Sequence, residues 1–93
     1  MTLRLTRPAQ ADIDNAFDYL DKESPRGARL VIGRIGSAFA KLDRAPYMGR
    51  PGRIDGTREL VVPRTSYIAI YEVTEIGVTV LRVMHGRQQW PPI

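Results

Sequence analysis

The spacing of apolar residues predicts one strand and then two helices in the first half of the chain. Leu3 and Leu5 alternate with polar residues, which is typical of a short strand. A helical stripe of about four turns follows Pro8, a residue suited to a first helical turn. A second stripe follows Ser24 and Pro25, which suit an N-cap and the position after it. The first stripe is Ile13, Ala16, Phe17 and Leu20, and the second is Ala28, Val31, Ile35, Ala38, Phe39 and Leu42.

The second half of the chain predicts a loop and then three strands. Helical periodicity stops at residues 43–57, where glycine and proline are frequent, so we expect an irregular segment there. Strand-like runs follow at residues 58–62, 66–74 and 78–85, with a compact turn at Glu75–Gly77 between the last two. These last two runs are apolar on both faces, as in the centre of a sheet.

The resulting order β-α-α-β-β-β predicts an α+β fold. Consecutive strands joined by short turns pair in antiparallel fashion, and the helical hairpin is expected to cover one face of this mainly antiparallel sheet. The first strand is expected to join the sheet at an edge. The chain has 93 residues, of which 43% are hydrophobic, and this predicts a single globular domain over residues 1–93.

Charge is distributed unevenly along the chain. Fourteen basic and ten acidic residues give a net charge of +4, and twelve of the fourteen bases are arginine. The first predicted helix is acidic and the second is basic, which predicts complementary faces in the hairpin. The planar donor fork of arginine suits phosphates and carboxylates and favours an anionic partner, while solubility explains a charge of this size equally well.

Several classes of chemistry are absent from the sequence. It has no cysteine and one histidine, which excludes disulfides and thiol nucleophiles and leaves no ligand cluster for a metal. No phosphate-binding or dinucleotide-binding glycine motif is present, so no cofactor is expected. No signal peptide is apparent and the longest apolar run, residues 67–71, is too short to span a bilayer. We therefore expect a cytoplasmic protein that does not contact membranes.

The candidate site residues are cations on the predicted sheet and the loop before it. They are Arg53, Arg58, Arg64, Arg82, His85 and Arg87. Arg82 alternates with Val80 and Met84 in an otherwise apolar strand, so its guanidinium needs an anion. That anion is either a ligand or an internal carboxylate, for example Glu59 or Glu72.

Other polar and aromatic residues each have two interpretations. His85 closes the same strand on the face opposite Arg82, as a polar strand end or as a general acid–base group. Tyr67 and Tyr71 share a face of the central strand and are expected in the core with polar tips. Trp90, in an irregular tail, is expected to fold over the sheet as a lid, with nucleobase stacking as the alternative.

The second helix carries small residues at helical spacing. Gly33 and Gly36, together with Ala40, form a strip of small residues that another helix or a partner could approach closely. We interpret it as the place where the first helix packs, with the docking of a partner as the alternative.

Three stretches carry a resemblance to a known family. They are Pro-Tyr-Met-Gly-Arg-Pro at 46–51, Arg-Glu-Leu-Val-Val-Pro at 58–63, and Leu-Arg-Val-Met-His-Gly at 81–86 followed by Trp90-Pro91. Through them, and over essentially its whole length, the chain resembles the RelE/ParE superfamily of type II toxin–antitoxin toxins. The predicted order of elements is similar to that fold.

Two branches of this superfamily imply different activities. The ParE-like branch implies an inhibitor of DNA gyrase without catalytic residues, and Arg53, Arg58, Arg64, Arg82 and His85 would then contact the target. The RelE-like branch implies a ribosome-dependent mRNA endoribonuclease, in which Arg58, Arg64, Arg82 and His85 would be catalytic. The catalytic tyrosine near the C-terminus of the nucleases has no counterpart here, and the predicted sheet has no lysine, so the ParE-like branch is favoured. A third hypothesis is a non-toxic member that acts in operon autoregulation.

Every branch implies the same kind of partner. This is a cognate antitoxin similar to ParD or RelB, whose acidic C-terminal segment folds as it binds and gives a toxin–antitoxin hetero-oligomer. We expect it to contact the basic second helix, at Arg29, Gly33, Arg34 and Gly36.

Overall fold

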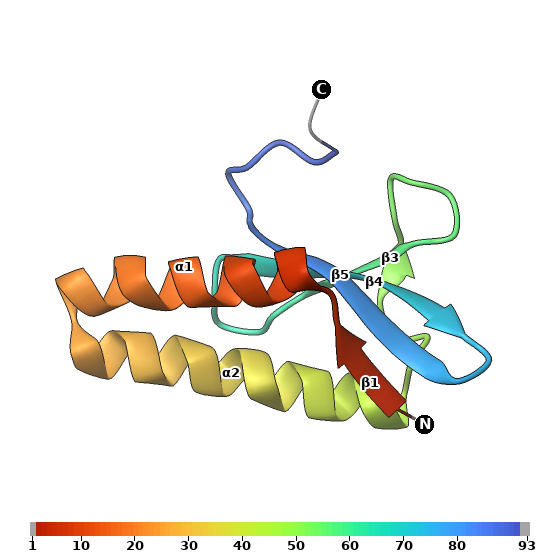
Figure 1. Ribbon diagram of the computed structural model, residues 1–93, viewed down its shortest axis with the longest axis horizontal. Helices are drawn as coiled ribbons and strands as arrows, with labels where there is room; N and C mark the ends of the chain where they lie inside the picture. Colours follow the sequence, from red (N-terminus) through yellow and green to blue (C-terminus); the bar gives the residue numbers. More distant parts are fainter. Residues whose placement is uncertain (1, 92–93) are drawn as a thin grey trace.

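The computed structural model describes residues 2–91. Its helices are α1 (Arg7–Glu23) and α2 (Pro25–Arg44), and its strands are β1 (Thr2–Leu5), β2 (Arg50–Pro51), β3 (Arg58–Val61), β4 (Tyr67–Thr74) and β5 (Gly77–His85). Figure 1 shows the two helices side by side against the sheet, whose five strands lie in the order β1-β5-β4-β3-β2. β1 runs parallel to β5 at one edge, and the other pairs are antiparallel. The predicted α+β fold is confirmed, including the position of the first strand.

Ser24 joins the two helices without an intervening loop. Its backbone N–H donates to the carbonyl of Leu20 at 2.8 Å and ends α1, while its hydroxyl accepts the N–H of Gly27 at 3.0 Å and caps α2. The start of α2 at Pro25 confirms the prediction from this Ser-Pro pair. One residue therefore ends one helix, begins the next and reverses the chain.

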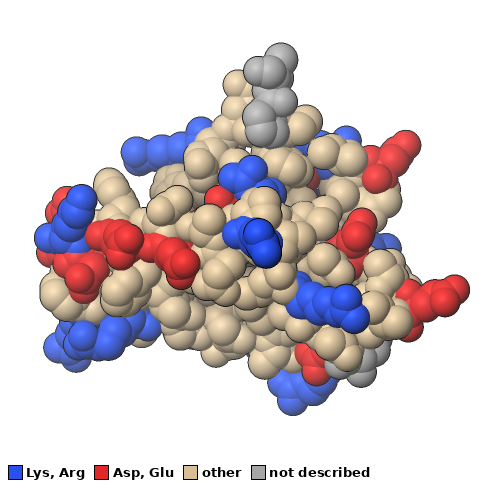
Figure 2. All heavy atoms as spheres, in the orientation of Figure 1, with Lys and Arg blue, Asp and Glu red and all other residues tan. Residues whose placement is uncertain are grey.

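The hairpin packs on the sheet through apolar side chains. The buried core cluster consists of Ala9, Ala16, Ile35, Ala38, Leu42, Val62, Tyr67, Tyr71, Val78, Val80 and Val83. Figure 2 shows acidic side chains along α1 and basic ones along α2 on the outside of the hairpin. Over residues 2–91 the ion pairs are Arg82–Asp12 and Arg50–Glu59, and neither joins the two helices. The predicted charge complementarity therefore does not produce ion pairs within the hairpin.

The junction of β1, α1 and β5 depends on one glycine and one threonine. A Cβ on Gly77, whose φ is +143°, would lie 1.9 Å from the carbonyl oxygen of Thr2, so only glycine lets the two strands approach. Thr6 caps α1 by accepting the N–H of Ala9 at 3.1 Å, and its hydroxyl donates to the carbonyl of Leu81 at 2.7 Å. Thr6 thereby continues the hydrogen bonding of β5 past the end of β1.

A β-bulge in β5 changes which side chains share a face. Tyr71 lies opposite Val80, whereas the preceding residue of β4 lies opposite Arg82, which leaves Leu81 as the extra residue. Because cross-strand partners share a face, Val80 faces the helices and Arg82 faces the other side together with Met84. The alternation in the sequence predicts that Arg82 shares a face with Val80 and Met84. This prediction is right for Met84 and wrong for Val80.

The segment at residues 43–57 is not wholly irregular, which corrects the sequence prediction. Arg50 and Pro51 form the short edge strand β2, paired with Glu59 and Arg58 of β3. The other predicted strands are each confirmed to within one residue of their observed bounds. No helix within residues 2–91 has the length and apolar character needed to cross a membrane.

Candidate functional site

Arg82 is held by a carboxylate of α1. Asp12 accepts from Nε and Nη2 of Arg82 at 2.7 and 2.9 Å, and it also accepts the N–H of Val83 at 2.9 Å. This two-bond contact is a strong arrangement for a guanidinium, and its hydrogen bonds raise the pKa of Arg82 above its usual value. The predicted internal ion pair is confirmed, but its partner is Asp12 and not Glu59 or Glu72.

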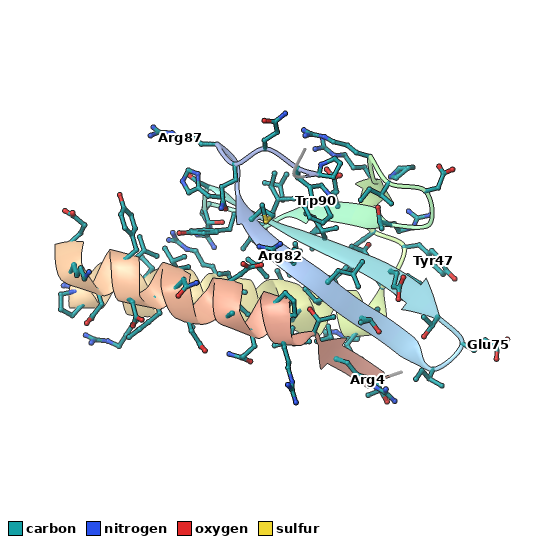
Figure 3. The ribbon with its side chains drawn as sticks, turned by 45° about the horizontal axis from the view of Figure 1, so that its top comes forward. Arg4, Tyr47, Glu75, Arg82, Arg87 and Trp90 are labelled. Carbon is teal, nitrogen blue, oxygen red and sulfur yellow. The ribbon has the colours of Figure 1, made fainter. Side chains whose placement is uncertain are left out.

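The tail brings Arg82 close to a second predicted residue, Arg53. Figure 1 shows the tail leaving β5 on the side of the sheet opposite α2. The carbonyl of Trp90 accepts from Nη1 of Arg53 at 2.7 Å, and the guanidinium of Arg82 lies 6.0 Å from the centre of the Trp90 ring (Figure 3). Trp90 therefore lies over the sheet as predicted, and it joins two of the predicted cations.

Glu59 anchors the loop that carries Arg53. Its side chain is 4% exposed and accepts Nη2 of Arg50 at 3.1 Å and the N–H of Arg53 at 3.0 Å. Burial acts to raise the pKa of Glu59, but the Arg53 N–H and the Arg50 guanidinium outweigh burial and leave the pKa below the usual 4.5. Glu59 is thus an ionised carboxylate with an internal structural role.

Arg58 organises the segment after α2. Its Nη1 donates to the carbonyls of Tyr47 and Gly49 at 3.2 and 2.7 Å, and its guanidinium lies 5.0 Å from the centre of the Tyr47 ring. On the other side of this segment, the N–H of Gly49 donates to the buried hydroxyl of Tyr71 at 2.9 Å. Arg58 therefore holds backbone carbonyls, and Tyr71 is a core residue with a polar tip, as predicted.

His85 lines a groove of about 440 Å³ between α1 and the end of β5. Its Nδ1 accepts the N–H of Arg87 at 3.1 Å, and its ring lies edge-on to Tyr67 with ring centres 5.4 Å apart. Because Nδ1 is an acceptor, the proton of the neutral ring lies on Nε2. The strand register places His85 and Arg82 on opposite faces, as predicted.

Arg64 lies apart from the other predicted cations. It occupies the turn between β3 and β4 with φ at +60°, and its carbonyl accepts Nη1 of Arg34 at 3.0 Å. Arg34, which we predicted to contact a partner, thus holds this turn against α2.

The small-residue strip of α2 faces solvent. Gly33 and Gly36 are exposed, and a Cβ added to either residue would meet no atom within 4 Å beyond its chain neighbours and the nearby backbone of its own helix. The interpretation that the first helix packs there is therefore wrong, because α1 meets α2 along another side. Arg29, on the same helix, is also exposed.

The predicted cations do not converge on one point. Arg53 and Arg82 meet at Trp90, and Arg58 lies under the loop after α2. His85 and Arg87 line one groove, and Arg64 lies apart in the turn between β3 and β4. Phosphoryl chemistry needs several cations and a proton-transfer group directed at one reacting centre. Within residues 2–91 no group of three histidine or acidic side chains is placed to hold a metal ion. The predicted cations therefore lie at separate places on the fold.

Sequence reasoning missed two residues that matter here. Asp12 looked like one of several acids on a solvated helix face, because nothing local marks it as the partner of a residue 70 positions away. Tyr47 is one residue of the motif at 46–51, in a segment without periodicity. A large aromatic residue there has no helix or strand to bury it, and this is the signal that marks it.

A family model and a curated relative match the chain over nearly its whole length. Residues 3–90 match the family described as "ParE toxin of type II toxin-antitoxin system, parDE". The chain is 42% identical over 91 residues to "Putative toxin Y4kP" of Sinorhizobium fredii, an alignment that covers 98% of this chain and 94% of that relative.

Solved structures of two toxin–antitoxin systems also match the chain. A chain of the "Chromosomal ParDE TA system from P. aeruginosa" matches with a TM-score of 0.81 and 28% identity, over 91% of this chain and 95% of that one. A chain of the toxin–antitoxin complex RelBE2 from Mycobacterium tuberculosis matches with a TM-score of 0.61 and 29% identity, over 90% of this chain and 95% of that one.

Proposed function

The chain belongs to the ParE family of type II toxin–antitoxin toxins, and on that premise we propose that it inhibits DNA gyrase and is neutralised by a cognate antitoxin. The observation that carries the proposal is the dispersal of the basic residues. Arg53, Arg58 and Arg82 donate to internal acceptors instead of facing a shared cavity. Such a protein acts by binding another macromolecule, and we place it in the cytoplasm together with gyrase.

The endoribonuclease alternative is weaker on the same ground. It would require Arg58, Arg64, Arg82 and His85 to stabilise one phosphate and to move protons around it. Arg82 is already bound to Asp12 by two hydrogen bonds, and His85 lies on the opposite face of the sheet. This separation of Arg82 from His85 favours the gyrase proposal over the nuclease.

A supercoiling and cleavage assay tests the proposal directly. Purified toxin without antitoxin is expected to block supercoiling of relaxed plasmid or to accumulate linear DNA only when gyrase is present. The same toxin mixed beforehand with its antitoxin serves as the control and is expected to have no effect. Untouched gyrase together with cleaved mRNA on programmed ribosomes would contradict the proposal and establish the nuclease.

We further propose that the antitoxin binds the outer face of α2. The two similar structures are described as toxin–antitoxin systems, and the open strip at Gly33 and Gly36 lets a helix approach closely. Arg29 would then attract the acidic segment of the antitoxin.

Charge reversal tests this docking face. Arg29→Glu is expected to slow association with the antitoxin and to weaken its salt dependence, measured by surface plasmon resonance. Lys22→Glu makes the same change of charge on α1 and is the matched control. Equal association rates for both variants would rule out this face.

A further inference from the structure

We propose that Tyr47 and Met48, in the segment between α2 and β2, form the apolar centre of the surface that docks on the toxin's target protein. The inference rests on the proposed function in one respect, namely that the protein acts by binding a target. It places target recognition away from the outer face of α2, where we expect the antitoxin.

Tyr47 and Met48 are exposed although the chain around them is fixed. Their exposed fractions are 66% and 47%, whereas the neighbouring Gly49 is buried. A Cβ on Gly49 would lie 2.6 Å from the hydroxyl of Tyr71, so this backbone is pressed against the core. Two apolar side chains thus point outward from a segment that is held in place from within.

Arg58 fixes the conformation of Tyr47 from the sheet side. It donates to the Tyr47 carbonyl at 3.2 Å and lies 5.0 Å from the centre of the same ring. A ring held in this way loses little conformational entropy when a partner covers it, and this reduces the free-energy cost of binding. Tyrosine, arginine and methionine are also the residue types enriched at protein–protein interfaces.

A pocket lies beside the Tyr47 ring. Its volume is about 270 Å³, and its lining includes Thr57, Arg58 and Val73. A side chain of a partner is small enough to enter a pocket of this size. The apolar contribution of Val73 favours an aliphatic or aromatic residue there.

The charge around this surface predicts an acidic rim on the partner. Residues 44–59 contain four arginines and two acids, which is a net charge of +2. The acid Glu59 is already paired with Arg50, and within residues 2–91 Arg44, Arg53 and Arg58 have no carboxylate partner. A protein fits better than single-stranded nucleic acid, because Met48 adds apolar area that base stacking does not use.

The test is the double variant Tyr47→Ala/Met48→Ser, assayed in three ways. It is expected to lower the affinity for purified gyrase by about 10- to 100-fold and to relieve growth arrest in cells without antitoxin. Its affinity for the antitoxin, measured by calorimetry, should change by less than about twofold, and its melting temperature should stay the same because both side chains are exposed. The proposal predicts that the single variant Tyr47→Phe keeps both its affinity for gyrase and its ability to arrest growth.

Tyr19→Ala is the matched control for lost aromatic exposure. Tyr19 is 66% exposed near the end of α1 that adjoins Ser24, whereas Tyr47 follows the opposite end of the hairpin, so the loss of Tyr19 should leave gyrase affinity and growth arrest unchanged. Equal growth arrest by the double variant and the wild type would overturn the docking surface. A double variant that stays toxic but loses its affinity for the antitoxin would also overturn the docking surface.

Two further outcomes separate this inference from the proposed function. If the wild type arrests growth without affecting gyrase, gyrase is the wrong target, and the growth assay of the variants still decides the surface. If the wild type binds a single-stranded oligonucleotide and the double variant does not, Tyr47 stacks on bases and protein docking is overturned. A wild type that neither arrests growth nor affects gyrase overturns both proposals together.

Discussion

Two carboxylates, Asp12 and Glu59, have similar hydrogen-bond partners and different structural roles. Each accepts from an arginine side chain and from a backbone N–H. Asp12 joins α1 to β5 across 70 positions of the sequence, whereas Glu59 joins β3 to a residue only nine positions away. The first contact holds the helical layer on the sheet, and the second shapes one loop at the opposite edge.

The contrast shows how sequence separation decides the consequence of a contact. Losing the Asp12 contact releases α1 from β5, and α1 must pack on the sheet for the whole fold to form. Losing the Glu59 contact frees a short segment whose opening leaves the core between helices and sheet intact. We therefore expect global unfolding to respond to Asp12, and local opening to respond to Glu59.

The largest expected effect is that of Asp12→Ala. It leaves the half-buried guanidinium of Arg82 without its anion and the N–H of Val83 without its acceptor, so we expect a loss of about 2–3 kcal/mol in the free energy of unfolding. Urea denaturation measures the loss. Asp14→Ala is the control, since within residues 2–91 this exposed side chain accepts a hydrogen bond only from the exposed Gln10, and we expect a loss of less than about 0.5 kcal/mol. Similar losses of unfolding free energy in both variants would show that Asp12 contributes no more than an exposed acid of α1.

Glu59→Ala is expected to be milder and more local. The N–H of Arg53 loses its partly buried acceptor, so we expect a loss of about 1–2 kcal/mol in the free energy of unfolding. Hydrogen exchange should accelerate at residues 50–53 and not in α1 or α2. Asp55→Ala removes an exposed acid from the same loop and should leave these exchange rates unchanged. Faster exchange throughout the helices would show that the loop is coupled to the whole fold.

Acid should reduce the contribution of Glu59. Its pKa is lowered in the folded protein, because bonds from Arg53 and Arg50 outweigh the effect of burial. The ionised carboxylate therefore contributes stability that is fully present above its unfolded pKa of about 4.5 and is lost as the pH falls through the folded value. The difference in unfolding free energy between the wild type and Glu59→Gln should shrink from about pH 7 to about pH 3. A difference that grows in acid would contradict this sign.

Arg50→Ala should have the smallest effect. Its side chain is 59% exposed, and Glu59 keeps the N–H of Arg53 after Arg50 is removed, so we expect about 0.5 kcal/mol. The effect of Arg50→Ala on the melting temperature should depend only weakly on the salt concentration. A loss as large as that from Glu59→Ala would show that the guanidinium, and not the backbone N–H, is the main partner of the carboxylate.

The elements that sequence predicted well are those with local causes. Ser24 and Pro25 mark a helix boundary by their own conformational preferences, and the apolar runs of β4 and β5 identify central strands without further information. The strand β2 was missed because two residues that include a proline carry no periodicity. Arg50–Pro51 becomes a strand only through pairing with β3.

The candidate site was less predictable than the fold, because side-chain partners depend on tertiary packing. The bulge at Leu81 turns Arg82 away from Val80, and no local pattern announces the extra residue. Arg53 and Arg58 were identified as cations, but their acceptors are backbone carbonyls, which every residue supplies and which sequence cannot distinguish. The sequence therefore locates the charged residues, and only the fold shows which groups they bind.

The parallel pairing of β1 with β5 has a consequence for the synthesis of this protein. Thr2–Leu5 leaves the ribosome early and must wait for Gly77–Val80, its partner across most of the chain. Contacts of such large sequence separation form slowly and close last. Until β5 has been translated, the nascent chain cannot complete its sheet, so a chain released from the ribosome before that point would be incompletely folded and open to proteases.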